Sequence, residues 1–173
     1  MDVHLVFNSF NKMLSISYEI VFPAQALFLE HISSTYPYLL RELATLDLAK
    51  LVTLMFDSVA KDGRLIHAKL TAILHAVNSQ IFHDSESRSL ILPTCCEHVK
   101  YHLIAKQELR LCCDILGDII TFLSLRKTDD LDPKRRFAGK DYLRFTRLNL
   151  SMNVDACLLL ILIYLDIFTA LSI

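Results

Sequence analysis

Three side chains that can bind zinc share one face of a predicted helix. Cys95, His98 and His102 stand at positions i, i+3 and i+7. Cys112 or Cys113 on the next predicted helix could complete a tetrahedral set of ligands. The set contains no Cys-x-x-Cys pair, which is the usual signature of a structural zinc site. Buried thiols that act as small hydrophobic groups are the stronger interpretation, so we assign no metal ligand and no cofactor.

The sequence contains no complete catalytic set either. A Cys–His nucleophilic pair needs a third, orienting group and an activated thiol, and neither is visible. Glu97 and Asp114 could form a carboxylate pair, but charges of this kind ordinarily lie on helix surfaces. The glycines at 63, 117 and 139 are isolated, so no phosphate-binding loop is indicated. We expect a protein that is not an enzyme and has no catalytic residue.

Composition favours a helical domain with a large core. The 173 residues are 53% hydrophobic, with a mean hydropathy of +0.39. Only 3 glycines and 4 prolines are present, too few for the turns of an all-β fold. A chain of this length is sufficient for one domain that buries a sizeable core.

The net charge and the cysteine content indicate which class of partner and which cellular compartment to expect. The net charge of −1 does not favour nucleic acid as a partner. The five cysteines are odd in number, and Met1-Asp2 opens the chain without the basic start of a secretory signal. We expect reduced thiols and a cytoplasmic location.

The first third of the chain predicts two helices. Within residues 1–22, apolar side chains recur at helical spacing at Val3, Phe7, Phe10 and Leu14. Pro23 suits the first turn of a second helix, where its missing N–H costs no hydrogen bond. Apolar side chains on one side of that helix are Leu27, Phe28 and Ile32. Ser33, Ser34 and Pro37 should end it.

Two clear apolar stripes follow, separated by a short polar link. The first stripe consists of Leu48, Leu51, Val52, Met55, Phe56 and Val59. The second consists of Ile66, Leu70, Ile73, Leu74, Val77 and Ile81. Thr45 or Asp47 should cap the first helix, and Gly63 should end it in a left-handed conformation. Two antiparallel helices that form a hairpin are the simplest interpretation.

Residues 84–125 repeat this plan. Asp84 or Ser85 should cap a helix in which Pro93 causes a kink or a restart. Its buried face should continue through Cys96, Val99 and Leu103, with His98 and His102 at the partly exposed rim. After a link at Lys106-Gln107, the last stripe consists of Leu109, Cys112, Cys113, Leu116, Ile119, Ile120 and Leu123.

Hairpins spaced by about 40 residues indicate an all-α fold of stacked antiparallel helical hairpins, an armadillo/HEAT-like α-solenoid fragment. We expect a helical repeat domain at residues 1–125 and a polar basic linker at 126–141. A C-terminal helical segment should occupy residues 142–173.

A family resemblance lies in residues 82–93, FHDSESRSLILP, and in residues 106–123, KQELRLCCDILGDIITFL. These segments resemble the helical repeat region of the DOCK (dedicator of cytokinesis) guanine nucleotide exchange factors, and the hydrophobic pattern extends the similarity from Phe22 to Lys127. The resemblance rests chiefly on Glu86-Ser87-Arg88, Leu92-Pro93 and the stretch from Glu108 to Gly117.

In that family the armadillo-like region lies between a lipid-binding C2-type domain and the domain that exchanges nucleotide on Rac or Cdc42. The resemblance implies a non-catalytic scaffold segment, a fragment or truncated product, with small-GTPase signalling proteins as partners. No exchange activity carries over to any residue of this chain.

The tail supports an alternative, a small tail-anchored membrane protein with a cytosolic helical domain. Residues 156–173, ACLLLILIYLDIFTALSI, carry Asp166 as their only charge. As a helix they would span about 27 Å, close to the thickness of the hydrocarbon layer. The stretch 126–147, with eight basic and four acidic residues, offers a second membrane contact. We favour a packed terminal helix, whose deletion should cause aggregation.

The last stripe gives a stability prediction. We expect Leu116→Ala to lower the free energy of unfolding by about 2–5 kcal/mol, because burial is lost and a cavity remains. Lys106→Ala, in the polar link, should cost little. Urea unfolding of the two variants measures the difference, and equally small effects would contradict the proposed helix.

Overall fold

Every described element of secondary structure is a helix. The computed structural model describes residues 3–61 and 63–129, and these ranges contain no strand. The α-helices are α1 (Val3–Leu14), α2 (Phe22–His31), α3 (Tyr36–Leu39), α4 (Thr45–Ser58), α5 (Ile66–Val77), α6 (Gln80–His83), α7 (Ser85–Ile104) and α8 (Leu109–Asp129). Two 3-10 helices, η1 (Glu19–Val21) and η2 (Ile32–Thr35), flank α2. The predicted all-α class is confirmed.

The chain divides into two compact units, residues 1–111 and residues 112–173. The first unit contains α1–α7, and the described part of the second is the remainder of α8. Among the α8 side chains up to residue 123, those of Cys112, Ile115, Leu116 and Ile119 are buried and share one helix face. The predicted division at residues 125 and 141 stays a prediction, because residues 130–173 lie outside the described part of the chain.

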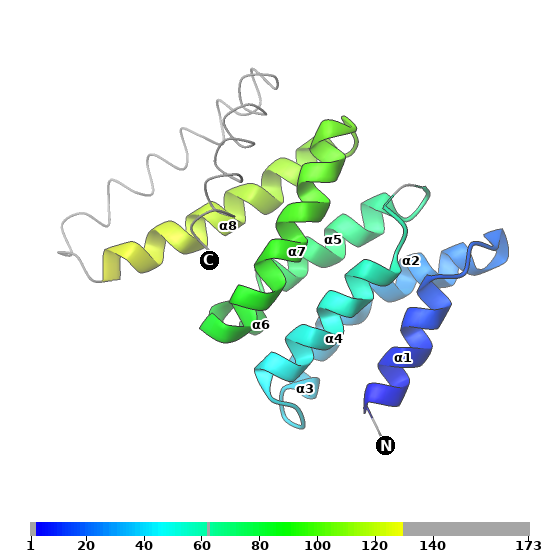
Figure 1. The fold of residues 1–173 in the computed structure, drawn as a ribbon, viewed down its shortest axis with the longest axis horizontal. Helices are drawn as coiled ribbons and strands as arrows, with labels where there is room; N and C mark the ends of the chain where they lie inside the picture. Colours follow the sequence, from blue (N-terminus) through cyan, green and yellow to red (C-terminus); the bar gives the residue numbers. More distant parts are fainter. Residues whose placement is uncertain (1–2, 62, 130–173) are drawn as a thin grey trace. The chain divides into compact units, whose positions relative to one another are not determined.

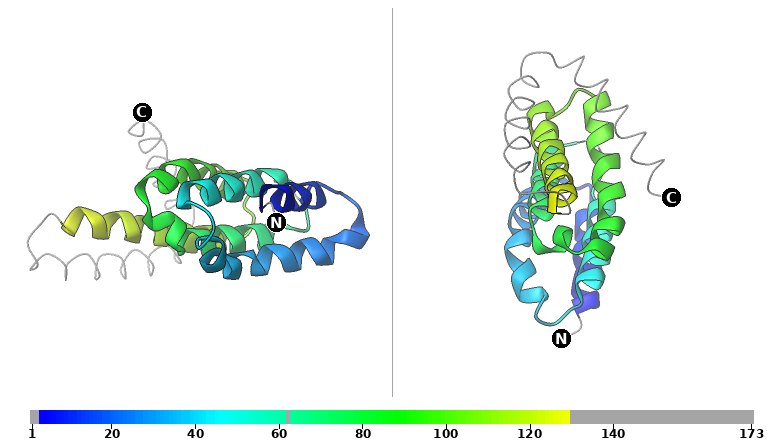
Figure 2. Two further views of the ribbon diagram at one scale, coloured as in Figure 1. Left: turned by 90° about the horizontal axis from the view of Figure 1, so that it is seen from below. Right: turned by 90° about the vertical axis from the view of Figure 1, so that its left-hand side faces the viewer.

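Helices α1–α7 form a helical array of two layers (Figures 1 and 2). In one layer α4 packs between α1 and α7, and in the other α2 packs against α5. The helices α4 and α5 belong to different layers and run in opposite directions, so they form a hairpin. The helices of the first layer begin 42 and 40 residues apart, at Val3, Thr45 and Ser85. Stacked antiparallel hairpins with a repeat near 40 residues are therefore confirmed.

The apolar stripe predicted along α4 forms the centre of the core. All six apolar residues predicted along α4 are buried, and four of them have no exposed surface: Leu48, Val52, Met55 and Phe56. Because α4 has a neighbour on each side in its layer, its apolar face is covered by helices from the preceding and following repeats.

A buried amide joins α1 to α2. The Gln25 side chain is completely buried, and its Nε2 donates hydrogen bonds to the carbonyl oxygens of Met13, at 2.7 Å, and Ile16, at 2.9 Å. These bonds hold α2 to the last turn of α1, which contains Met13, and to Ile16 just after it. Gln25 and Leu29 occupy the buried face of α2. The predicted position of Leu27 on that face is wrong, since its side chain is 58% exposed.

The ends of α4 differ from those predicted. Its N-cap is Ala44, which has no side-chain oxygen, so Thr45 is already the first helical residue. Asp47 instead accepts a hydrogen bond from Lys50 at 2.9 Å. The helix ends at Ser58, five residues before Gly63. Gly63 has a φ of 116°, so it serves the loop and not the helix end.

The start of α7 is as predicted. Asp84 is the N-cap, and its carboxylate accepts a hydrogen bond from the Ser87 backbone N–H at 2.9 Å. The predicted restart at Pro93 does not occur, because α7 continues through this residue to Ile104. Pro93 is exposed, so the carbonyl that loses its helical bond lies where water can reach it.

The end of α7 is a Schellman motif without glycine. The Lys106 N–H donates to the Leu103 carbonyl at 3.1 Å, and the Gln107 N–H donates to the His102 carbonyl at 2.9 Å. Lys106 takes the left-handed position of this motif, with a φ of 56°. The predicted link at Lys106-Gln107 is therefore a defined turn. Its Lys106 has a positive φ, which raises the free energy of an L-residue.

This turn predicts that Lys106→Gly stabilises the protein. Glycine adopts positive φ without steric cost, and its greater freedom in the unfolded chain offsets part of the gain. We expect a net increase of about 0.5–1 kcal/mol in the free energy of unfolding. Gln107→Gly, one residue later, is the matched control and should destabilise. If both variants lose stability in urea unfolding, the strain assigned to Lys106 is wrong.

Candidate functional site

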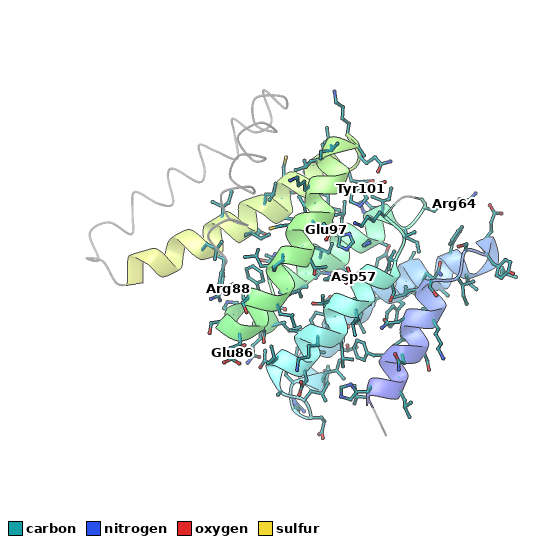
Figure 3. The ribbon with its side chains drawn as sticks, viewed as in Figure 1. Asp57, Arg64, Glu86, Arg88, Glu97 and Tyr101 are labelled. Atoms are coloured by element: carbon teal, nitrogen blue, oxygen red, sulfur yellow. The ribbon has the colours of Figure 1, made fainter. Side chains whose placement is uncertain are left out.

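Polar side chains gather where the end of α4 faces α5 and α7. This polar cluster consists of Asp57, Lys61, Lys69, Glu97 and His98. Figure 3 shows Asp57 on α4 and Glu97 on the neighbouring α7. Two of the five, Lys69 and His98, are buried, so they are the members that could have unusual chemistry.

Lys69 ties α5 to the end of α4. Its side chain has no exposed surface, and its Nζ donates a hydrogen bond to the Val59 carbonyl oxygen at 2.7 Å. Val59 is the C-cap of α4, where a cation interacts favourably with the helix dipole. Burial lowers the pKa of Lys69 to about 8, against the smaller raising effect of nearby Asp57.

His98 is buried and held neutral. It is 2% exposed, and its Nε2 lies 3.5 Å from the Asp57 Oδ1. Burial, followed by repulsion from Lys69, lowers the pKa of His98 to about 4. At neutral pH its contact with Asp57 is therefore a long hydrogen bond and not an ion pair. Its Nδ1 has no hydrogen-bond partner.

An ion pair between Lys61 and Glu97 lies at the surface of the cluster. The Lys61 Nζ donates to the Glu97 carboxylate, and this bond lowers the pKa of Glu97 and raises that of Lys61. The Lys61 Nζ also lies 5.8 Å from the centre of the Tyr101 ring. Both charged side chains are exposed, so solvent screens the pair and it adds little to stability.

The two buried members of the polar cluster make structural contacts and offer no accessible reactive group. Lys69 is engaged with a backbone carbonyl, and both Lys69 and His98 are enclosed by protein. A substrate would have to displace packed helices to reach either nitrogen. The geometry therefore supports a role in holding α4, α5 and α7 together.

The zinc alternative gains no support from the placement of its residues. Cys95 and His102 are completely buried along α7, as His98 nearly is, so the predicted rim position of the two histidines is wrong. The buried face of α7 runs through Cys95, and Cys96 is only half-buried. Within residues 3–61 and 63–129, no three His, Cys, Asp or Glu side chains are grouped to hold a metal ion.

The other residues considered for chemistry are the carboxylates Glu97 and Asp114 and the cysteines. Glu97 pairs with Lys61, and Asp114 belongs to the second unit of the chain. Four cysteines are described, and all are free thiols: Cys95, Cys96, Cys112 and Cys113. Burial raises the pKa of the Cys95 thiol and raises that of Cys96 to about 11.

The residues that carry the family resemblance have structural roles. The Ser87 Oγ donates to the Asp84 carboxylate at 2.7 Å, beside the cap of α7. The Arg88 Nη1 donates to the carbonyl oxygen of Phe82 at 3.1 Å, near the end of α6. Ser87 and Arg88 thus fix the junction of α6 with α7, and Figure 3 shows Glu86 and Arg88 at this end of the helix.

Sequence reasoning missed Lys69, although one signal could have found it. Lys69 stands four residues before Ile73 and three after Ile66, on the apolar stripe of α5. A lysine on such a stripe is either at its edge or buried against a helix end. The pattern alone does not show the α4 carbonyl that makes burial favourable here.

Comparison with known proteins agrees with the architecture. A family model described as "Dedicator of cytokinesis (DOCK) TPR region" matches residues 2–136. "Dedicator of cytokinesis protein 3" of Mus musculus and of Homo sapiens is 41% identical over 64 residues, which are 37% of this chain and 3% of that protein. "Dedicator of cytokinesis protein 4" of Homo sapiens is 27% identical over 113 residues, 61% of this chain and 6% of that protein. No solved structure matches significantly.

Membrane contact stays a prediction. No helix within residues 3–61 and 63–129 is long and apolar enough to cross a membrane. The apolar segment 156–173 and most of the basic stretch 126–147 lie outside the described residues.

Buried Lys69 predicts a pH-dependent stability. Its folded pKa of about 8 lies below its ordinary value of 10.5, so the unfolded state binds more protons between these values. The contribution of Lys69 to the free energy of unfolding should therefore rise with pH in this window, by about 2 kcal/mol from pH 7 to pH 10. Lys69→Met should lack this gain.

The difference between wild type and Lys69→Met is the quantity to measure, by urea unfolding at several pH values. The buried thiols titrate in both proteins, so their opposing contribution cancels in the difference. A difference that does not change between pH 7 and pH 10 would show that Lys69 is not buried as a charged group.

Proposed function

Because the chain belongs to the DOCK family, through a match to its TPR region over residues 2–136, we propose that it is a non-catalytic helical scaffold in small-GTPase signalling. The observation that carries the proposal is this match to a helical repeat region, in agreement with the stacked hairpins. The Rac and Cdc42 pathways, in which exchange factors of this family act, are the proposed setting.

The architecture supports protein binding in preference to chemistry. Stacked helical hairpins present extended surfaces that bind other proteins. The buried polar groups of α4, α5 and α7 are used within the fold. A net charge of −1 favours protein partners over nucleic acid, and we place the protein in the cytoplasm.

The chain spans 3% of one relative and 6% of the other, so their activities as whole proteins do not transfer directly. We infer that this chain corresponds to a repeat segment of such a protein, with residues 1–125 as the repeat domain. In the family, nucleotide exchange belongs to a different domain. We therefore assign this chain no exchange activity of its own.

This proposal predicts no acceleration of nucleotide release. The chain should leave the rate of release of a fluorescent guanine nucleotide from Rac and Cdc42 unchanged at every chain concentration, because buried Lys69 and His98 are not available to a partner. A rate that increases with chain concentration would contradict a non-catalytic role.

Binding tests the positive part of the proposal. Purified chain should bind at least one defined component, tested one by one: Rac, Cdc42 or full-length dedicator of cytokinesis protein 3. Leu48→Asp, which places a charge in the core of α4, is the control that should abolish folding and specific binding together. A folded chain that binds none of these proteins would overturn the scaffold role.

A further inference from the structure

The connection between α1 and α2 contains the longest run of exposed residues in the described part of the chain, residues 15–20. Ile20, 87% exposed, and Tyr18, 76% exposed, are the two most exposed large apolar side chains of that part. Figure 1 shows the connection at one edge of the helical array, beyond the end of α1. Side chains at this edge can contact another protein without any movement of the helices.

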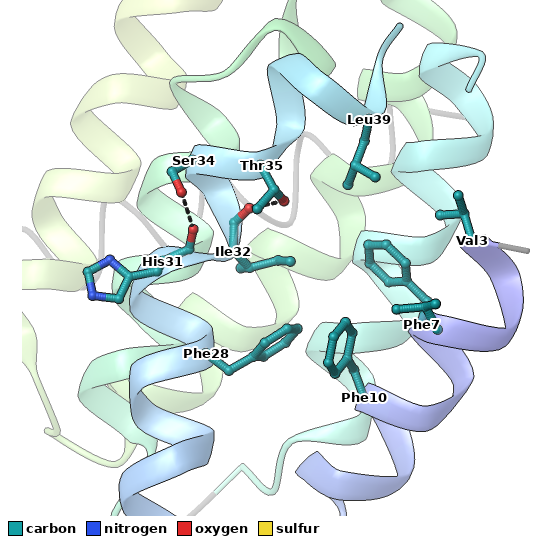
Figure 4. Close-up of a pocket in the computed structure, with 10 residues that line it drawn as sticks. Val3, Phe7, Phe10, Phe28, His31, Ile32, Ser34, Thr35 and Leu39 are labelled. Carbon is teal, nitrogen blue, oxygen red and sulfur yellow. Dashed lines mark hydrogen bonds between the residues drawn. The ribbon is translucent and has the colours of Figure 1, made fainter. Parts of the chain in front are cut away.

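The helices on either side hold this connection in place. The rings of Phe10 on α1 and Phe28 on α2 have their centres 4.4 Å apart, and Figure 4 shows the two side chains next to each other. The Gln25 Nε2, which donates to the Ile16 carbonyl oxygen at 2.9 Å, joins α2 to the beginning of the connection. The loop is therefore fixed by its flanking helices while its side chains lie in solvent.

A further contact joins the connection to the loop between α4 and α5. The Arg64 guanidinium lies 2.8 Å from the Glu19 carboxylate and 5.6 Å from the centre of the Phe22 ring. The Arg64 and Glu19 side chains are 68% and 75% exposed. The carboxylate that follows Tyr18 in the chain is therefore accessible to another protein although it has a cationic partner.

Tyr18 lies outside the helices in an extended conformation. Its φ of −78° and ψ of 132° belong to the β region, and its carbonyl oxygen accepts the Val21 N–H at 3.1 Å. An enzyme can take a residue directly from an exposed, extended loop. A residue within a helix reaches an enzyme cleft only after backbone hydrogen bonds open.

None of the other tyrosines in the described residues combines an exposed side chain with an extended backbone. Tyr36, Tyr38 and Tyr101 all lie in helices. Tyr36 is 1% exposed and Tyr101 is 38% exposed. Tyr38 is 66% exposed, but it belongs to α3, and the Arg41 guanidinium lies 5.4 Å from the centre of its ring.

We propose that Tyr18 is a phosphorylation site for a protein tyrosine kinase. The side chain presents its hydroxyl to solvent, the extended backbone fits a substrate cleft, and Glu19 supplies charge of the kind by which kinases distinguish substrates. The proposal does not depend on the role in GTPase signalling, because it rests on the connection between α1 and α2 alone.

The reaction transfers the γ-phosphoryl group of ATP, which the kinase binds with Mg²⁺. A bond forms between the Tyr18 Oη and the γ-phosphorus as the bond from that phosphorus to the β–γ bridging oxygen breaks. ADP leaves, and the phenol proton passes to a base of the kinase. The product carries about −1.5 to −2 charges at pH 7 on an exposed side chain, so the helical array should stay folded.

Phosphorylation of the full chain by the catalytic domain of a Src-type tyrosine kinase, with ATP and Mg²⁺, tests the proposal. Synthetic peptides of residues 12–24 and 32–44 are the references without the fold, and fragment mass spectrometry assigns the phosphate to single tyrosines. We expect the kcat/KM for Tyr18 in the folded chain to lie within about threefold of its value in the peptide. The kcat/KM for helical Tyr38 should be at least about tenfold lower in the folded chain than in its peptide.

Tyr18→Phe and Tyr38→Phe are the matched variants. Tyr18→Phe should abolish most of the phosphate found in residues 13–41 of the folded chain, whereas Tyr38→Phe should leave it unchanged. Both variants keep the aromatic ring, so both should remain folded, and urea unfolding checks this.

Three results would overturn the assignment. The first is a kcat/KM for Tyr18 in the folded chain that is more than threefold below the peptide value, because the fold would then withhold the hydroxyl. The second is similar phosphate uptake at Tyr18 and Tyr38 in the folded chain, because the extended connection would then give no preference. The third is no phosphate at Tyr18 in either the peptide or the chain, because its flanking residues would then not suit a kinase.

Discussion

The structure depends on one constraint, which is that no helix of the array can cover its own apolar face. The α4 residues Leu48, Val52 and Met55 are buried because α1 and α7 lie on either side of that helix. Each of these neighbours is contributed by a different repeat, about 40 residues away in the chain. Stability is therefore shared between adjacent repeats.

Long polar side chains that are buried or half-buried serve helix ends in this fold. Gln25 donates to carbonyls at the end of α1, Lys69 to the end of α4, and Arg88 to residues at the end of α6. A helix leaves its last carbonyls without partners, and in a two-layered array these ends lie against neighbouring helices where water is excluded. Long side chains from the adjacent helix supply the missing donors. Polar groups at such positions indicate packing geometry before they indicate catalysis.

Much of the fold could be predicted from the sequence, because helical periodicity records which face of each helix is buried. The stripes of α4 and α5, the cap at Asp84 and the link at Lys106-Gln107 all follow from local patterns. The burial of a side chain could not be predicted from the sequence where it depends on the position of a neighbouring helix. Lys69 and His98 are buried because of the α4 end and the α4–α7 contact, and Cys95 replaces Cys96 on the inner face of α7 for the same reason. No local pattern contains that information.

The inner face of α7 also determines how its adjacent thiols react. Only thiolates attack disulfides or oxidants at a useful rate. With the pKa of Cys96 near 11, about one molecule in ten thousand carries a Cys96 thiolate at pH 7, and the enclosed Cys95 ionises still less. The vicinal cysteines of this helix are therefore slow to oxidise or alkylate while the array is folded. Reaction of the enclosed Cys95 with a maleimide reports that α7 has opened, which makes this thiol a built-in chemical probe of local unfolding.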